Sequence, residues 1–251
     1  MHTANLFASL LVLLALVLGA APARAETVNC TAITTLPAII TVQGVYCFTG
    51  NLATDMTTGN AIDIQTDNVV LDLNGFQLDG FAAGLGTQAT GIFASNRQNI
   101  TIKNGTIRGV FIGILLDNGS SHVVEDIRAD QNTSEGIDVR GLASIIRNNQ
   151  VVATGGSTAF GADASAVGIG VQSNGVRVMN NDVINTVKQG TGTAWGILLQ
   201  GVVGGLVTNN RITSADKGIE YFGGSSGKYR DNLTFGVTIP FSGGTDAGNN
   251  N

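Results

Sequence analysis

The chain has 251 residues, including 35 glycines, 3 prolines and, counted from the printed sequence, 23 asparagines, and its formal net charge is −5. Charged residues make up 12% and apolar residues 43%, which argues against disorder, because disordered chains combine low hydrophobicity with high net charge. The composition also argues against collagen, helical bundles and a nucleic-acid-binding protein, which needs clustered Lys and Arg. It predicts a β-rich protein that uses Gly and Asn at sharp turns.

An export signal is predicted at the N-terminus. Residues 6–20 form a nearly unbroken apolar run, and Ala23-Arg24-Ala25 matches the A-x-A pattern for cleavage after residue 25. That run is short for a membrane span, and no later segment reaches the ~18 apolar residues that a span needs. We therefore expect residues 1–25 to be removed and the protein to be secreted or periplasmic, without a membrane span.

The next segment, residues 26–59, is predicted to be an N-terminal cap. It holds both cysteines, Cys30 and Cys47, and in an oxidising compartment we expect them to form a disulfide. Closing a loop of this size stabilises a protein by about 3 kcal/mol. Metal binding is a poor alternative, because two cysteines without a nearby histidine do not complete a site.

One short pattern recurs after residue 60: a small residue, then Ile, a variable residue and an apolar residue. The pattern begins at Ala61, Gly91, Gly113, Gly136, Gly168, Gly196 and Gly218. Its steps of 22 to 32 residues are typical of solenoids, propellers and arrays. Each unit therefore contributes at least one short strand to a repeating architecture.

A second strand follows in each unit and ends in a polar pair, after which a third strand begins. The pairs are Asn74-Gly75, Asn104-Gly105, Asn148-Asn149, Asn180-Asn181, Asn209-Asn210 and Asp231-Asn232. Asn and Gly tolerate positive φ, so we expect one left-handed residue at each turn. Asparagines stacked from coil to coil can also hydrogen-bond to one another. The unit at residues 124–127 has acidic residues in place of the pair.

Three short strands in about 22 residues make one coil of a parallel β-helix. Leucine-rich repeats would show L-x-x-L-x-L spacing and propeller blades need about 40 residues. A β-sandwich is the remaining alternative, but the fixed order of motif and turn favours a solenoid, in which every coil buries apolar residues. We expect the solenoid over residues 60–242 and a flexible tail over residues 243–251.

From about residue 60 to residue 232 the chain resembles the right-handed parallel β-helix proteins of the pectate-lyase-like superfamily. The likeness is carried by "NVVLDLNG", "NITIKNGTIRG" and the Gly-Ile repeats. The segment from Cys30 to Cys47 resembles the N-terminal cap of secreted bacterial members. The resemblance implies an all-β fold, a single-stranded right-handed β-helix of about seven coils. Because such helices host lyases, hydrolases, epimerases, esterases and non-catalytic proteins, it implies no single activity.

Side chains alternate along a strand, so the register predicts two outward columns on the Gly-Ile strands. The first column is Asp63, Phe93, Leu115, Asp138, Gly170, Leu198 and Glu220, and the second is Gln65, Ser95, Asp117, Arg140, Gln172, Gln200 and Phe222. Insertions at residues 79–90, 154–166 and 186–194 precede three of these strands. We expect them to flank a trough two coils wide.

The densest set of charges in the chain lies in or beside this trough: Asp117, Asp138, Arg140, Arg128, Asp130 and Glu135. Asp117 and Asp138 should be roughly 7–8 Å apart, within the rough 6.5–9.5 Å window of an inverting glycosidase pair. A lyase or epimerase would instead need a base and a cation for the uronate carboxylate, and Arg140 or Arg128 could supply the latter. Asp130, Glu135 and Asp138 could bind Ca²⁺ through oxygen ligands.

The favoured alternative for this cluster is an inert ladder of surface ion pairs, with Asp117 opposite Arg140. The motifs of alginate epimerases, polygalacturonases and serine hydrolases are missing from the sequence. His122, the one histidine after the predicted cleavage site, is interpreted as a packing residue. Trp195, beside an insertion, is the best candidate for stacking on a sugar, although covering the helix wall is its favoured role.

Two hypotheses follow for function. The favoured one is a secreted, non-catalytic β-helix that binds glycans or has a structural role at a surface. The alternative is a lyase or glycosidase acting on an extended acidic polysaccharide, with Asp117, Asp138 and Arg140 as catalytic residues and Arg128, Asp130, Glu135 and Trp195 in substrate binding. No cofactor is predicted apart from possible Ca²⁺.

Overall fold

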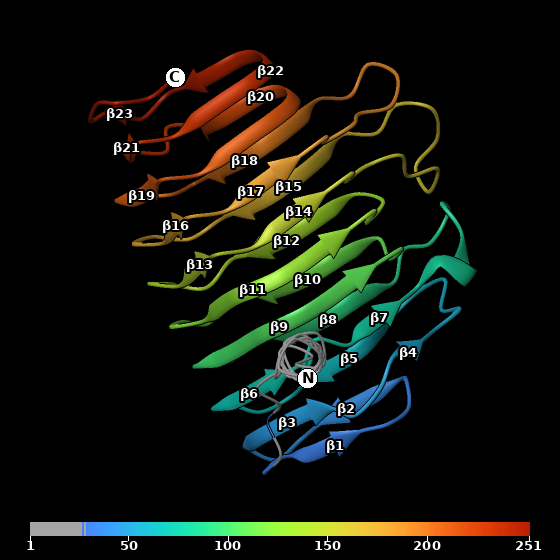
Figure 1. Cartoon of the computed structure of the whole chain (residues 1–251). Helices are drawn as coiled ribbons and strands as arrows, with labels where there is room; N and C mark the ends of the chain where they lie inside the picture. The colour runs from blue at the N-terminus through green and yellow to red at the C-terminus, as the bar shows by residue number, and fades with distance from the viewer. Residues whose placement is uncertain (1–26, 28) are drawn as a thin grey trace, which may run out of the picture.

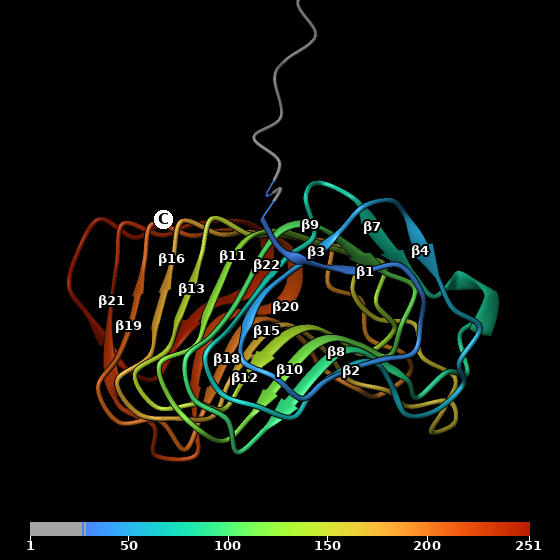
Figure 2. The same ribbon diagram turned by 90° about the horizontal axis from the view of Figure 1, so that it is seen from below.

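The computed structural model describes Thr27 and residues 29–251, so the predicted signal peptide, residues 1–25, lies outside the described residues. Strands of successive coils pair side by side in parallel and build one solenoid (Figure 1). Seen from below, its coils enclose a single core (Figure 2). We call the three faces of the solenoid sheets 1, 2 and 3.

Sheet 1 consists of β2 (Ala38–Ile40), β5 (Asn60–Ile64), β8 (Thr90–Ser95), β10 (Ile112–Asp117), β12 (Glu135–Val139), β15 (Ala166–Val171), β18 (Ala194–Gln200) and the later parts of β20 (Arg211–Phe222) and β22 (Leu233–Ser242). Sheet 2 consists of β1 (Thr31–Ile33), β3 (Gly44–Phe48), β6 (Val69–Asp72), the first parts of β9 (Ile100–Arg108) and β11 (Val123–Asp130), then β13 (Ile145–Arg147), β16 (Arg177–Met179), β19 (Gly205–Thr208), β21 (Gly227–Arg230) and β23 (Thr245–Asp246). Sheet 3 consists of β4 (Leu52–Ala53), β7 (Gln77–Asp79), the later parts of β9 and β11, β14 (Gln150–Val152), β17 (Asp182–Ile184) and the first parts of β20 and β22.

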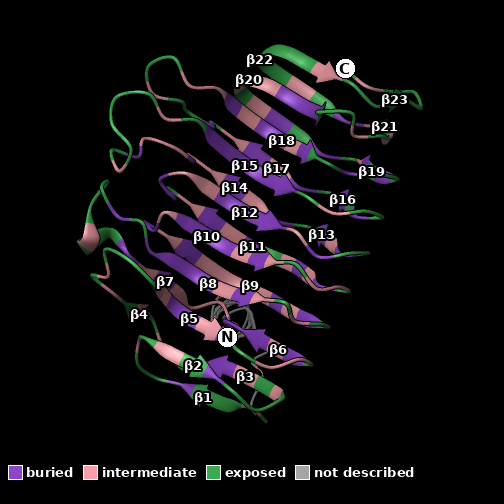
Figure 3. Ribbon diagram, turned by 180° about the vertical axis from the view of Figure 1, so that it is seen from behind, coloured by how far each residue is buried: buried purple, intermediate pink, exposed green. Residues whose placement is uncertain are grey.

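The core is built from columns of apolar side chains that repeat at one position per coil. All seven strands with the small-Ile motif lie in sheet 1, and their isoleucines are aligned and fully buried: Ile62, Ile92, Ile114, Ile137, Ile169, Ile197 and Ile219. Buried residues therefore form bands along the strands in Figure 3. The small residue before each Ile is required by close packing, since a Cβ on Gly113 would lie 2.4 Å from the carbonyl oxygen of Gly136.

The polar turns between sheets 2 and 3 confirm the predicted backbone. Their first residues are left-handed, with φ of 57° at Asn104, 56° at Asn148 and 56° at Asn180. The acidic unit follows the same rule, because Asp126 takes this position with a φ of 54°. The turn geometry is thus constant even where the residue type changes.

The second residues of these turns form a buried ladder of asparagines. Asn149, Asn181, Asn210 and Asn232 each donate from Nδ2 to the Oδ1 of the next asparagine, at 2.9–3.0 Å, and Asn250 ends the series. The same side chains also donate to backbone carbonyls of the preceding coil. Buried amides are stabilised only when their hydrogen-bonding groups are satisfied, and the ladder does this.

Both ends of the solenoid differ from the predicted boundaries. The sequence predicts a cap over residues 26–59. Within its described part, β3 pairs with β6 and β2 with β5 in the same register as later coils, so residues 31–59 form the first coils rather than a separate cap. Cys30 and Cys47 form the predicted disulfide. Residues 243–251, predicted to be a flexible tail, instead pair through β23 with β21 and place Asn250 in the ladder. The ladder continues to the last coil and holds this segment.

The three insertions project from the edge between sheets 3 and 1, as predicted, and the first contains the short helix η1 (Phe81–Ala83) (Figures 1 and 2). They do not leave an open trough between them. The Thr158 amide donates to the Leu85 carbonyl at 3.0 Å, and the rings of Phe111 and Phe160 meet edge to face. The first and second insertions therefore meet across the two shorter coils, because loops of this length reach over them.

Candidate functional site

The outer face of sheet 1 carries the two columns that the sequence predicts. The strand register aligns Asp117 with Ser95, Leu115 with Asp138, and Gln200 with Phe222. The second column is polar over six successive coils, from Gln65 to Gln200, and ends at the exposed ring of Phe222. Adjacent strands are about 4.8 Å apart, so this column, which we call the polar file, runs along the solenoid.

Arg140 lies at the centre of the predicted charge cluster. It contacts Asp138 through Nε at 2.8 Å and Nη2 at 2.7 Å, and its Nη1 lies 3.4 Å from Asp117 Oδ1. The predicted pair between Asp117 and Arg140 is therefore present. Asp138 faces outward but its side chain is only 1% exposed, because Arg140 covers it and Gly170, the next residue in its column, lets its carboxylate settle against the sheet.

Glu135 completes this cluster in a way that strict alternation does not predict. Its carboxyl lies near enough to that of Asp138, three residues later, for the two groups to affect each other's ionisation. Gly136 lies between them, and a Cβ there would point at the core residue Val151. Gly136 and Ile137 thus both face inward, and Glu135 returns to the outer side. Burial and the Asp138 charge raise the pKa of Glu135 to about 8, so one carboxyl of the pair is protonated at neutral pH.

Two of the predicted site residues lie elsewhere. Arg128 and Asp130 belong to the part of β11 in sheet 3, where Arg128 pairs with Asp130 Oδ2 at 3.1 Å and also contacts Gln150. They form a separate ion pair and do not join Asp138. Among the described residues there is no group of three or more His, Cys, Asp or Glu placed to hold a metal ion. The predicted Ca²⁺ set of Asp130, Glu135 and Asp138 is therefore not assembled.

Trp195 lies on the same outer face as Glu135, in the same register column and two coils further on. Its Nε1 donates to Glu220 Oε2, and Glu220 also accepts a hydrogen bond from Lys217 Nζ at 2.6 Å. The Lys217 ammonium lies 6.0 Å from the centre of the indole ring. The sequence does not predict this group. Strict alternation would turn Trp195 and Lys217 inward, but the Gly that follows each of them packs against the neighbouring coil, and their side chains therefore lie on the outer face with Glu220.

Comparison with known proteins decides the family. Residues 39–235 match the family described as "Right handed beta helix region". The chain belongs to this right-handed β-helix family. No curated protein matches it.

Solved structures agree with this β-helix fold. The Dettilon tailspike protein gp208 is similar with a TM-score of 0.57 and 13% identity, over 80% of this chain and 46% of that one. This β-helix therefore spans less than half of the tailspike chain. An alginate lyase from Paenibacillus sp. str. FPU-7 is similar with a TM-score of 0.51 and 15% identity, over 82% of this chain and 85% of that one. At these identities the likeness shows the fold alone.

His122 has a structural role in the β-helix. Its side chain is buried, its Nδ1 accepts from the Ile100 amide at 3.3 Å, and its Nε2 lies 3.2 Å from the Asn118 carbonyl oxygen. These partners fix a neutral ring with the proton on Nε2, because only Nε2 faces an acceptor. Burial lowers the pKa of His122. This geometry agrees with the interpretation of His122 as a packing residue.

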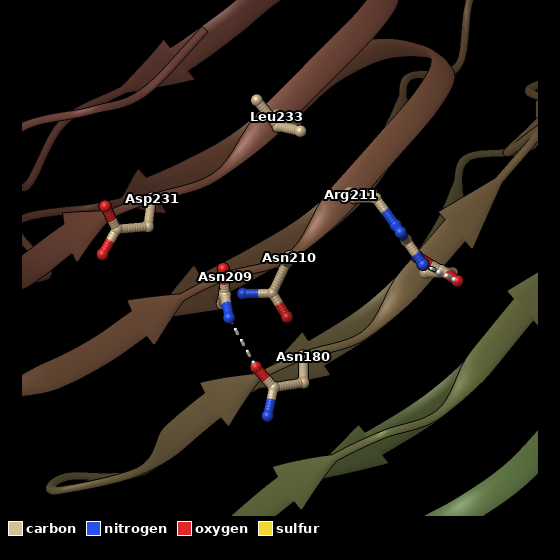
Figure 4. Close-up of a pocket in the computed structure, with 7 residues that line it drawn as sticks. Asn180, Asn209, Asn210, Arg211, Asp231 and Leu233 are labelled. Carbon is tan, nitrogen blue, oxygen red and sulfur yellow. Dashed lines mark hydrogen bonds and ion pairs between the residues drawn. The ribbon is translucent and has the colours of Figure 1, made fainter.

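Two of the hollows in the described part of the chain lie away from sheet 1. One, of about 280 Å³, lies at the corner of sheets 2 and 3, where Asn209 donates to Asn180 and Arg211 pairs with Asp182, so its polar groups satisfy one another (Figure 4). The other, of about 320 Å³, lies beneath the joined insertions and is mainly apolar, between Phe81, Leu85 and Ala153. No helix in the described part of the chain is long and apolar enough to cross a membrane.

Proposed function

We propose that this β-helix is an exported, non-catalytic protein that binds an extended polysaccharide along the outer face of sheet 1. The observation that supports this most strongly is the polar file. It offers amide, hydroxyl, carboxylate and guanidinium groups over six successive coils, about 24 Å at the spacing of parallel strands. A polymer lying along the solenoid would meet a hydrogen-bonding group at every coil.

The aromatic groups of the same face fit this role. Phe222 is exposed at the end of the polar file, and Trp195 is partly exposed on the same sheet, five residues before Gln200 along β18. Aromatic rings offer apolar faces on which other groups can pack. One of the two solved proteins that share this fold is, by its name, an alginate lyase, which makes a polysaccharide the first ligand class to test. The disulfide is typical of exported proteins.

The ion pairs favour binding over catalysis. Asp138 is enclosed and held by Arg140, so it is poorly placed to take a proton from a polymer. Asp117 and Arg140 are about one-third exposed and can still hydrogen-bond to a sugar. Under this proposal Arg140 both holds Asp138 and presents its remaining N–H groups to the ligand.

The test is affinity electrophoresis against neutral and acidic polysaccharides, followed by calorimetry with oligosaccharides of any that retards the protein. Gln172→Ala with Gln200→Ala should weaken binding at least tenfold, because each removes a hydrogen-bonding group from the polar file. Gln77→Ala on sheet 3 is the matched control and should bind like the wild type. Retention of full affinity by the double variant, or no binding to any polysaccharide, would contradict the proposal.

One observation favours catalysis as a second candidate. Glu135 keeps a proton to a pKa of about 8 beside Asp138, and perturbed carboxyl pairs are a feature of acid–base sites. In a lyase or glycosidase at this place, Glu135 would donate a proton, the more exposed Asp117 would act as base, and Arg140 would neutralise a uronate. Assays for unsaturated products and for new reducing ends test this. Identical rates for wild type and Glu135→Gln would end it.

A further inference from the structure

The two ends of the solenoid share features that the coils between them lack. At the C-terminal end, β22 runs for ten residues and pairs with β20 on one side only among the described strands. At the start of its other edge the Thr234 amide donates to the Asn251 carbonyl at 2.6 Å, and Pro240 lacks an N–H donor. Beyond Thr234 the rest of this edge pairs with no described strand. An open strand edge of this kind is a template for pairing with another chain.

No side chain of β22 is charged, and most are apolar; Thr234, Thr238 and Ser242 are the polar ones. Phe235 is 80% exposed, and Leu233 and Ile239 are also exposed. The preceding coil carries charges at the aligned positions, since Arg211 is opposite Leu233 and Lys217 is opposite Ile239. No charged residue occurs from residue 232 to residue 245. Charges normally protect edge strands from association, and β22 has none.

The N-terminal end has the same character. No charged residue occurs from residue 27 to residue 54, and Ile39, Val42 and Val45 are exposed, Ile39 to 64%. Among the described strands, β2 and β4 each pair only with the coil that follows. The first and last coils lie at opposite ends of the stack (Figure 1). Among the described residues, each end thus combines strands that pair on one side only with exposed apolar side chains and few charges.

We propose that this protein associates with further copies of itself end to end, the edge of β22 in one copy pairing with the N-terminal edge of the next. Head-to-tail order is favoured because every strand pair of the named sheets is parallel, and only this order continues parallel pairing. The inward column that contains Ile62 and Ile219 begins with Ala38 and ends with Phe241. In such a contact the large side chain of Phe241 in one copy would lie next to the small side chain of Ala38 in the next copy.

The charge at the edge of sheet 2 does not oppose this contact. Asp246 on β23 accepts hydrogen bonds from the Gly248 amide at 2.7 Å and from Asn250 Nδ2 at 2.6 Å, so its carboxylate is held within its own coil. Copies joined head to tail form an open chain unless the rotation between successive copies closes them into a ring. We therefore expect a concentration-dependent series of species rather than a single dimer.

The experiment is sedimentation velocity on the purified chain over a wide range of concentration. The wild type should form species larger than dimers. A variant blocked at the C-terminal edge, Phe235→Lys with Ile239→Lys, should be monomeric, and so should one blocked at the N-terminal edge, Ile39→Lys with Val42→Lys. All four positions are exposed, and thermal melting checks that each variant is folded. Val203→Lys, at an exposed turn within the stack, is the control and should assemble like the wild type.

Mixing the two blocked variants gives the decisive result. One retains a free C-terminal edge and the other a free N-terminal edge, so head-to-tail contact predicts a heterodimer and nothing larger. A wild type that stays monomeric at every concentration overturns the proposal. So does self-association of the N-terminally blocked variant alone, because that result means that two C-terminal edges meet.

Discussion

Arg140 holds the enclosed carboxylate of Asp138 with both Nε and Nη2, at 2.8 and 2.7 Å, while its own side chain remains 31% exposed. The charge of Asp138 therefore has one main counter-charge, which lies at the surface. Removing one partner of a buried ion pair is costly because the other charge stays buried. Arg140, a residue of the polar file, should therefore contribute to the stability of the protein through Asp138.

Arg140→Ala should destabilise the protein by about 1–3 kcal/mol, less than for a fully buried pair because water screens Arg140. The matched control is Arg211→Ala, which removes an equally direct pair with Asp182 at a site where Arg211 is 67% exposed. That change should cost clearly less than Arg140→Ala, because water screens an exposed ion pair. Urea unfolding measures both. If Arg140→Ala lowers the free energy of unfolding no more than Arg211→Ala does, then Arg140 is not needed to stabilise the buried charge of Asp138.

Glu135 should make stability fall as pH rises. Its folded pKa is about 8 against an ordinary value of 4.5, so between these pH values the folded chain holds a proton that the unfolded chain has lost. The stabilising contribution is complete below about pH 4.5 and is lost progressively up to about pH 8, with a slope of at most about 1.4 kcal/mol per pH unit.

Glu135→Gln should remove this dependence and be more stable than the wild type at the upper end of the window. The difference between the two chains is the quantity to measure, because burial lowers the pKa of His122, and that residue makes stability rise with pH as it becomes neutral. Glu125→Gln, at a carboxylate paired with Arg147 on sheet 2, should keep the wild-type slope. Equal slopes in the wild type and in Glu135→Gln would contradict the assignment.

The outward columns could be predicted because side chains alternate with a period of two along each strand. The register confirms the predicted outward positions of Leu115, Asp117 and Arg140. The contact between Glu135 and Asp138 could not. Strict alternation places residues three apart on opposite faces, and Gly136 breaks it by facing inward beside Ile137. The first and second insertions meet through the backbone hydrogen bond between Leu85 and Thr158, for which the sequence carries no periodic signal.

The asparagine ladder should contribute strongly to stability through its middle members. Asn181 is fully buried, accepts from the backbone and side chain of Asn149, and donates to Asn210 and to the Ile146 carbonyl. Asn181→Ala leaves several of these groups without partners, so we expect a loss of about 2–4 kcal/mol. Asn180→Gly, at the neighbouring left-handed position, keeps the turn and should change stability by less than about 0.5 kcal/mol. Calorimetric melting compares the two, and equal losses would refute a special role for the ladder.

The disulfide should stabilise the first coil. Cys30 precedes β1 and Cys47 lies in β3, with 17 residues of separation and Cα atoms 5.8 Å apart. Replacing both with Ala should lower the free energy of unfolding by about 3 kcal/mol, because the unfolded chain is then no longer restricted by a closed loop of this size. A reductant should lower the melting temperature of the wild type and leave that of the variant unchanged. Hydrogen exchange should show the loss of protection in β1 before later coils, since β1 has only β3 as a strand partner among the described strands. Uniform loss of protection along the solenoid would instead mean that the disulfide acts on the fold as a whole.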